Sequence, residues 1–272
     1  MQDLSFVWLE ITGRCSLFCD HCYADSGPKG TEGTMLPRDW LRVIDEVAQL
    51  GGRMVQFIGG GPTLHRSLPA FVDHALVDGL EVEVFSNLVH VSPQLWGVFA
   101  QPGVRLATSY YSDNATEHEA ITKRRNSYTR TKANIVEALR RSIPLRVGLI
   151  EVQDGQRVEQ ARAELEALGV TEVGFDRLRQ VGRGVRDQQP NVEQLCGRCA
   201  DRVIAISPDG SVWPCVFARW LPVGNVRESA LREILDGAIL ATTRRRLRRN
   251  FVERQCGPEK QKCAPESRCE PS

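Results

Sequence analysis

Three closely spaced cysteines constrain this chain more than any other feature. Cys15, Cys19 and Cys22 stand in the spacing C-x3-C-x2-C, directly after a short apolar run at residues 6–11. Three thiolates on one loop can hold three corners of a four-iron cluster, which usually takes four cysteines. The spacing therefore predicts a cluster with one iron open to an outside ligand. A zinc site is the alternative, with His21 inside the loop as the fourth ligand.

The composition is that of an ordinary soluble enzyme. The chain has 272 residues, 42% hydrophobic and 25% charged, with a net charge of +1. This length allows one large domain and a small one, and the charge favours neither nucleic acid nor a membrane surface as partner. No apolar run approaches the roughly eighteen residues of a spanning helix, and no signal peptide is recognisable. We expect a cytoplasmic chain, in which nine cysteines indicate metal rather than disulfides.

The cysteine-free middle of the chain alternates β-like and helical patterns. Strands are expected at residues 6–11, 54–58, 81–86, 104–110, 145–152 and 172–176. Helices are expected at residues 37–49, 67–77, 93–99, 128–141 and 158–168. This alternation predicts an α/β fold, with a parallel sheet and crossover helices. Six units are too few for a closed eight-stranded barrel.

Polar and glycine residues follow several of these strands, where the chemistry of parallel barrels gathers. Gly59, Gly60 and Gly61 allow close approach of backbone to a ligand, although a tight strand–helix turn explains them equally well. Strand-end residues Ser86, Asn87 and Ser109 come after the next two strands. Candidate catalytic carboxylates that could face a substrate are Glu10, Glu151 and Asp176.

The remaining cysteines gather in the C-terminal part, at Cys196, Cys199, Cys215, Cys256, Cys263 and Cys269. The turn Pro208-Asp209-Gly210 between residues 202–206 and 211–215 predicts a hairpin, which brings Cys199 close to Cys215. A helix-like stretch follows at residues 230–236. A zinc site is again the alternative. The run RRRLRR at residues 244–249 is interpreted as a solvated helix face, with a phosphate-binding patch as the alternative.

Together these motifs resemble the radical S-adenosylmethionine enzymes, from Phe6 to Cys269. The cysteine spacing after the first strand matches that family, as does a glycine turn one strand later. The hairpin with its trailing cysteine, the Gly224-Asn225-Val226 segment and the late cysteines resemble its SPASM or twitch extension. The resemblance implies a partial, TIM-like (β/α)6 barrel at residues 1–185. A small cysteine-rich α+β domain is then expected at residues 186–272.

The resemblance also implies cofactors. A 4Fe-4S cluster on Cys15, Cys19 and Cys22 is expected to bind S-adenosylmethionine, and the six later cysteines to hold one or two auxiliary clusters as metal ligands. Gly59, Gly60 and Gly61 are the expected contacts of the methionine amino group. Ser86, Asn87 and Ser109 are expected near the cofactor, and Lys123 or Arg124 near its carboxylate. The chain departs from the family's usual Gly-Gly-Glu-Pro, because Gly61 replaces the glutamate.

The implied reaction is reductive cleavage of S-adenosylmethionine to a 5′-deoxyadenosyl radical, which abstracts a substrate hydrogen. We expect modification of a ribosomally synthesised peptide, by cross-linking or oxidation. A small-molecule dehydrogenase or epimerase acting on a sugar or aminocyclitol is the alternative. A non-catalytic iron–sulfur electron-transfer or sensor protein is the alternative of another class. Expected partners are the substrate, an electron donor such as flavodoxin or ferredoxin, and a separate peptide-recognition protein, because the first strand begins close to Met1.

Overall fold

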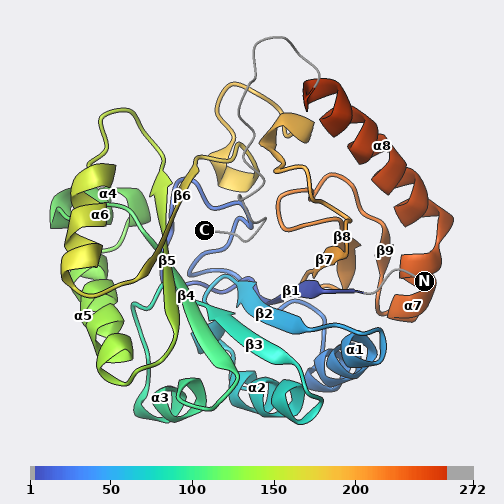
Figure 1. Cartoon of the computed structure of the whole chain (residues 1–272), viewed down its shortest axis with the longest axis horizontal. Coiled ribbons are helices and arrows are strands. Elements are labelled where there is room, and N and C mark those ends of the chain that lie inside the picture. Colours follow the sequence, from blue (N-terminus) through green and yellow to red (C-terminus); the bar gives the residue numbers. More distant parts are fainter. Residues whose placement is uncertain (1–3, 256–272) are drawn as a thin grey trace.

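One nine-stranded sheet organises the chain, in the order β6-β5-β4-β3-β2-β1-β7-β8-β9 (Figure 1). The structure is a computed structural model that describes residues 4–255. The first six strands are β1 (Phe6–Thr12), β2 (Met54–Gly59), β3 (Glu81–Phe85), β4 (Val104–Tyr110), β5 (Leu145–Glu151) and β6 (Glu172–Arg177). Neighbouring strands among these six are parallel, and the sheet stays open between β6 and β9. The expected α/β fold, an open partial barrel, is confirmed.

Helices cover the outer face of the six-stranded part (Figure 1). They are α1 (Pro37–Gln49), α2 (Leu68–Val77), α3 (Pro93–Phe99), α4 (Ala115–Thr122), α5 (Ser127–Arg140) and α6 (Val158–Ala167). Five were expected from the sequence, and α4 was not. Its sequence ATEHEAIT has little apolar periodicity, but the Asn114 side chain caps it by accepting from the Glu117 N–H at 3.2 Å. No described helix is long and apolar enough to cross a membrane.

The C-terminal part continues the same sheet. Strand β7 (Val203–Ile206) pairs in parallel with β1, and β8 (Ser211–Trp213) and β9 (Gly224–Asn225) follow antiparallel. The expected hairpin is therefore present. Helices α7 (Leu231–Asp236) and α8 (Ala238–Gln255) complete the described region. Strands from both sides of the expected domain boundary, residues 185 and 186, belong to the same sheet. The division into two domains there stays a prediction.

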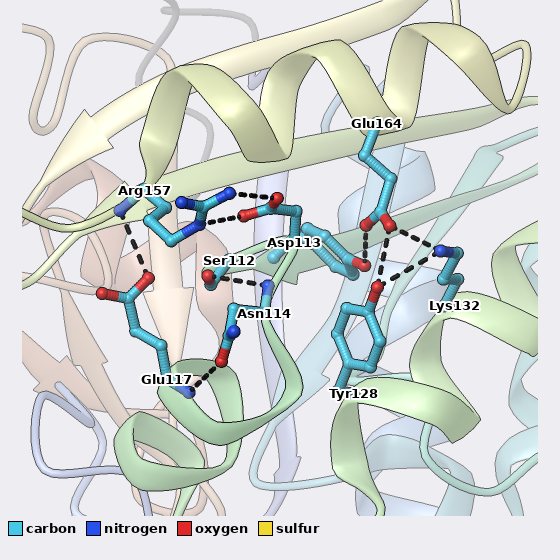
Figure 2. Close-up of polar contacts among 9 residues, drawn as sticks. Ser112, Asp113, Asn114, Glu117, Tyr128, Lys132, Arg157 and Glu164 are labelled. Carbon is cyan, nitrogen blue, oxygen red and sulfur yellow. Dashed lines mark hydrogen bonds and ion pairs between the residues drawn. The ribbon is translucent and has the colours of Figure 1, made fainter.

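A polar network joins α6 to β4 and α5 on the outer side of the barrel (Figure 2). Glu164 accepts hydrogen bonds from the hydroxyls of Tyr110 at 2.6 Å and Tyr128 at 2.7 Å, and it also pairs with Lys132. Beside it, Arg157 donates two 2.7 Å bonds to the carboxylate of Asp113. These contacts hold the loop that leaves β4, and this loop begins with residues of the candidate site.

Buried charges fill the barrel interior at its amino end. Arg146 on β5 donates two 2.8 Å bonds to Glu83 on β3, which also contacts Arg105 at 2.8 Å and Gln56. Burial by itself raises the pKa of Glu83, but the bonds from Arg146 and the charge of Arg105 outweigh burial, so its pKa is lowered. The carboxylate thus stays ionised and links β2, β3, β4 and β5.

Removal of one member of this buried ion-pair network should lower the stability of the fold. We expect Arg146→Met to lower the free energy of unfolding by about 3 kcal/mol, because it weakens the pairing of a buried carboxylate. The double variant Glu83→Gln with Arg146→Met should recover part of the loss. The control is Arg140→Met, which breaks an ion pair whose arginine side chain is 66% exposed and should cost at most about 1 kcal/mol. Urea denaturation of the metal-free proteins measures all three, and equal losses in the two single variants would contradict the assignment.

Candidate active site

One cavity lies at the carboxyl end of the parallel strands and brings together eight of the expected site residues. The cysteine loop, the glycine turn and the ends of β3, β4 and β6 all contribute to its wall. The expected residues that line it are Cys15, Cys19, Cys22, Gly59, Gly60, Asn87, Ser109 and Asp176. Its other walls are mostly apolar or aromatic and include Tyr23, Ile58, Phe85, Tyr111, Ile150 and Phe217.

All three cysteines of the loop line this cavity, and N–H groups donate to the sulfurs of two of them. The Leu17 N–H and the Asn87 side-chain amide each donate to Cys15 Sγ at 3.4 Å, and the Ser26 N–H donates to Cys22 Sγ at 3.4 Å. Such donors stabilise thiolates. Burial raises the pKa of Cys15 and raises that of Cys19 well above its usual value, so metal must displace their protons on binding. Three converging thiols in a largely apolar cavity fit an iron–sulfur cluster with one open position.

Arg183 holds this loop in place. Its guanidinium donates to the carbonyl of Cys19 at 3.0 Å and to the carboxylate of Asp25 at 2.7 Å, and it lies 4.2 Å from the ring centroid of Phe18. The neighbouring Gly182 has φ +59°, and a Cβ there would lie 2.4 Å from the Tyr23 carbonyl oxygen. The contact of Arg183 with Asp25 joins residues 158 positions apart, and no local sequence pattern reveals it.

The glycine turn packs directly against the start of the cysteine loop. The N–H groups of Gly60 and Gly61 donate at 2.7 Å to the carbonyls of Thr12 and Arg14. A Cβ on Gly60 would lie 2.2 Å from the Arg14 carbonyl oxygen. Gly61 differs, because a Cβ there would meet nothing closer than 3.5 Å, and Gly61 is not part of the cavity wall. A Cβ at Gly61 would therefore meet its neighbours only at ordinary van der Waals distances.

Other polar candidates occupy different positions. The Ser86 hydroxyl accepts from the Leu88 N–H at 3.1 Å and is buried behind the cavity, whereas Asn87 and Ser109 line it. Lys123 pairs with Asp20 at 2.7 Å on the surface of the cysteine loop. Arg124 is exposed.

The three candidate carboxylates are each paired with an arginine. Glu10 is buried and accepts two bonds of 2.7 and 2.8 Å from Arg219; burial raises its pKa, and the arginine offsets this in part. Glu151 lies 3.4 Å from Arg177. Asp176 lines the cavity but is bonded to Arg179, at 2.6 Å for the closest atoms. Of the three, Asp176 alone lines the cavity, and its bonds position Arg179.

A tyrosine that sequence reasoning missed contacts the cysteine loop. The Tyr111 hydroxyl lies 3.1 Å from His21 Nε2, and both side chains line the cavity. Burial lowers the pKa of His21 to about 4, so its ring is neutral at physiological pH. Tyr111 follows β4 directly, a position that could have marked it beside Ser109.

A second thiol pair lies behind one wall of the cavity. The Sγ atoms of Cys199 and Cys215 are 2.9 Å apart in a buried cluster that also contains Phe217, which lines the cavity. The neighbouring thiol and burial raise the pKa of Cys199. Cys196 packs against the same cluster. The expected ligands Cys256, Cys263 and Cys269 lie outside the described residues.

An open parallel barrel with a three-cysteine loop at the carboxyl ends of its strands defines an iron–sulfur enzyme of radical type. The family model of the radical SAM superfamily matches residues 9–182, and the chain belongs to this superfamily. The model of the SPASM iron–sulfur cluster-binding domain matches residues 196–269. The cofactors of these two domains are 4Fe-4S clusters and S-adenosylmethionine.

Individual relatives share both parts. The chain is 24% identical over 273 residues to a PqqA peptide cyclase of Xanthomonas campestris, covering 84% of this chain and 72% of that protein. Streptococcus suis SuiB bound to its precursor peptide SuiA has a similar fold, with a TM-score of 0.74 at 12% identity over 89% of this chain and 67% of that one. BtrN in complex with AdoMet and 2-DOIA has a TM-score of 0.53 at 15% identity, over 93% and 91%.

Iron content tests the cysteine assignment. Anaerobically reconstituted protein should carry more than about four irons per chain, because the two cysteine groups each hold at least one cluster. Replacing Cys15, Cys19 and Cys22 together by alanine should remove about four of them. Iron and zinc are measured on the same samples, and stoichiometric zinc with little iron would overturn the assignment.

Gly60→Ala and Gly61→Ala form a matched pair for the glycine turn. We expect Gly60→Ala to weaken binding of S-adenosylmethionine about tenfold or more, because the added methyl forces the backbone to move. Gly61→Ala should change the affinity less than about twofold, since its Cβ would meet Leu64 only at the ordinary contact distance of 3.5 Å. Equilibrium dialysis of the reconstituted proteins measures both, and equal affinities in the two variants would be the contrary result.

Proposed function

We propose that this enzyme cross-links or oxidises a ribosomally synthesised peptide. The observation that carries the proposal is the match to a PqqA peptide cyclase, which extends over 84% of this chain and 72% of that protein. SuiB, solved with a precursor peptide, shares the same fold. A one-electron donor such as flavodoxin or ferredoxin, and a separate peptide-recognition protein, are the further proposed partners.

The cavity is suited to contain a reactive radical. When bound, the cluster and S-adenosylmethionine supply a 5′-deoxyadenosyl radical, which removes a hydrogen atom from the substrate. The apolar walls Ile58, Phe85 and Ile150 exclude water from this space. We assign Asn87 and Ser109 to the cofactor, because both line the same cavity as the three cysteines.

Charges at the β6 side of the cavity suit a peptide. Arg177 and Arg179 line this side, and the Arg177 side chain is 79% exposed. The neighbouring Phe175 on β6 is 46% exposed, and β6 is an edge of the sheet. An edge strand with an exposed aromatic side chain can pair with an extended peptide, and the arginines can bind its carboxylates.

A cross-link requires net loss of two hydrogen atoms, so a second electron and a proton must leave the substrate after the first hydrogen atom is removed. We propose that Cys199 and Cys215 would help to hold an auxiliary cluster, which when bound would supply an acceptor for this electron. Support comes from Phe217, which lines the cavity and belongs to the buried cluster around both cysteines. The Arg179 guanidinium lies 5.6 Å from the Phe217 ring centroid, between the cavity and the thiol pair.

Oxidation of a small molecule is the second candidate. It is favoured by the similarity to BtrN, which covers 91% of that chain, although at a lower TM-score than SuiB. Both candidates use the same cavity and the same cysteines. They differ in the substrate that the β6 side admits.

The test supplies the reconstituted enzyme with S-adenosylmethionine, dithionite and a small peptide encoded next to its gene. We expect a peptide that has lost two hydrogen atoms, detected by mass spectrometry. Cys199→Ala with Cys215→Ala should still form 5′-deoxyadenosine but should lose most of the oxidised peptide. Unaltered peptide beside an oxidised aminocyclitol or sugar would favour the second candidate, and equal loss of both products in the variant would assign the cysteine pair a structural role alone.

A further inference from the structure

Helix α8 carries an arginine run whose members point to two sides. Leu247 is 1% exposed and packs in the buried cluster that contains Cys199 and Cys215. Arg244 donates to the Ala200 carbonyl at 2.7 Å, and Arg248 lies 3.4 Å from the Asp201 carboxylate. These two arginines therefore fasten the helix to the cysteine-rich part.

Arg245, Arg246 and Arg249 form a separate arginine face. Their spacing of three and four residues places them together on one side of the helix, and all three are exposed. Many other arginines of the chain pair with carboxylates, as Arg146, Arg157 and Arg179 do. Among the side chains that the structure describes, no carboxylate pairs with the three arginines of this face.

Like charges three or four residues apart destabilise a helix. If the arginines were only solvated, no interaction would offset this loss of helix stability. The face is also hollowed rather than flat. The three arginines line a depression together with Trp220 and with Pro190, Asn191 and Val192 of the preceding loop. A concave surface with an aromatic side chain and three cations that no described carboxylate pairs favours a large acidic partner over bulk water.

The position of the arginine face next to the cysteine pair indicates which kind of partner would bind there. Trp220 and Val192 line the depression and also pack against the cluster that surrounds Cys199 and Cys215. Phe217 and Tyr23 join that same cluster to the wall of the active-site cavity, with ring centroids 5.2 Å apart. The cysteine pair thus lies between the cavity and the arginine face, and helix α8, about 10 Å thick, separates it from solvent.

We propose that the arginine face of α8 docks an acidic one-electron carrier protein of the flavin or iron–sulfur class. The iron–sulfur centre of the cysteine-rich part, once reduced by the electron from the substrate, would pass one electron to the oxidised carrier; the centre is then oxidised, the carrier is reduced, and no bond forms or breaks. The proposal rests on the redox chemistry of the superfamily and holds for a peptide or a small-molecule substrate. A peptide substrate is less well placed on this face, because the cysteine-rich core stands between it and the cavity.

The test measures binding of a recombinant flavodoxin with net negative charge to the reconstituted full-length enzyme. We expect affinity to fall steeply as salt rises from about 0.01 to 1 M, where the screening length shortens from about 30 to about 3 Å. The triple variant R245E/R246E/R249E should bind at least about tenfold more weakly at low salt. If this variant fails to fold, as judged by circular dichroism, the neutral R245Q/R246Q/R249Q should show a smaller loss in the same direction.

The control R38E/R53E/R130E changes the net charge equally at exposed arginines on other surfaces, and should bind flavodoxin within about twofold of the parent. Equal loss in both triples, or no loss in the face triple, would overturn the proposal. So would loss of substrate binding in place of flavodoxin binding. With dithionite as reductant and no carrier present, the face triple should form 5′-deoxyadenosine and product as the parent does. Failure of the proposed substrate would appear in the parent enzyme as well, whereas failure of docking would appear only when the carrier is added.

Discussion

The cysteine loop has to keep three thiols together without regular secondary structure of its own. No helix or strand lies between Thr12 and Pro37. The loop folds back on itself through a bridge between Arg14 and Gly27, and it is held from outside by Arg183 and by the glycine turn after β2. Removal of these supports would leave thiols whose burial favours the protonated, metal-free form. The cavity, the cofactor contacts and the neighbouring thiol pair are all arranged around a loop that other segments position.

Strong periodic patterns made most of the fold predictable. Buried parallel strands such as residues 145–151 are short and rich in apolar residues, and helix α1 between two of the strands has a clear apolar face. Helix α4 was not predicted, because capping by Asn114 and packing of His118, rather than an apolar stripe, stabilise it. The pairing of β7 with β1 was also beyond local patterns, since it joins strands nearly 200 residues apart, as in the register of Phe6 with Val203.

The candidate site was predictable where backbone position decides it. Strand-end residues such as Asn87 and Ser109 meet at one edge because the strands are parallel. The roles of charged side chains depend instead on partners elsewhere in the chain. Glu10 was a candidate for substrate contact, yet Arg219, more than 200 positions away, binds it inside the protein. Arg183 and Tyr111 were missed for the same reason, because their partners in the cysteine loop are distant in sequence.

The insertion of β1 between β2 and β7 has a consequence for how the protein is made. Strand β1 receives its second neighbour only after residues 203–206 have been synthesised. Until then one edge of a buried, apolar strand is open, and such edges invite pairing with other chains. The nascent barrel therefore depends on strand β7, in its own C-terminal part, to cover the open edge of β1. Metal that reaches the cysteine loop before that moment would bind to a barrel whose sheet is not yet complete.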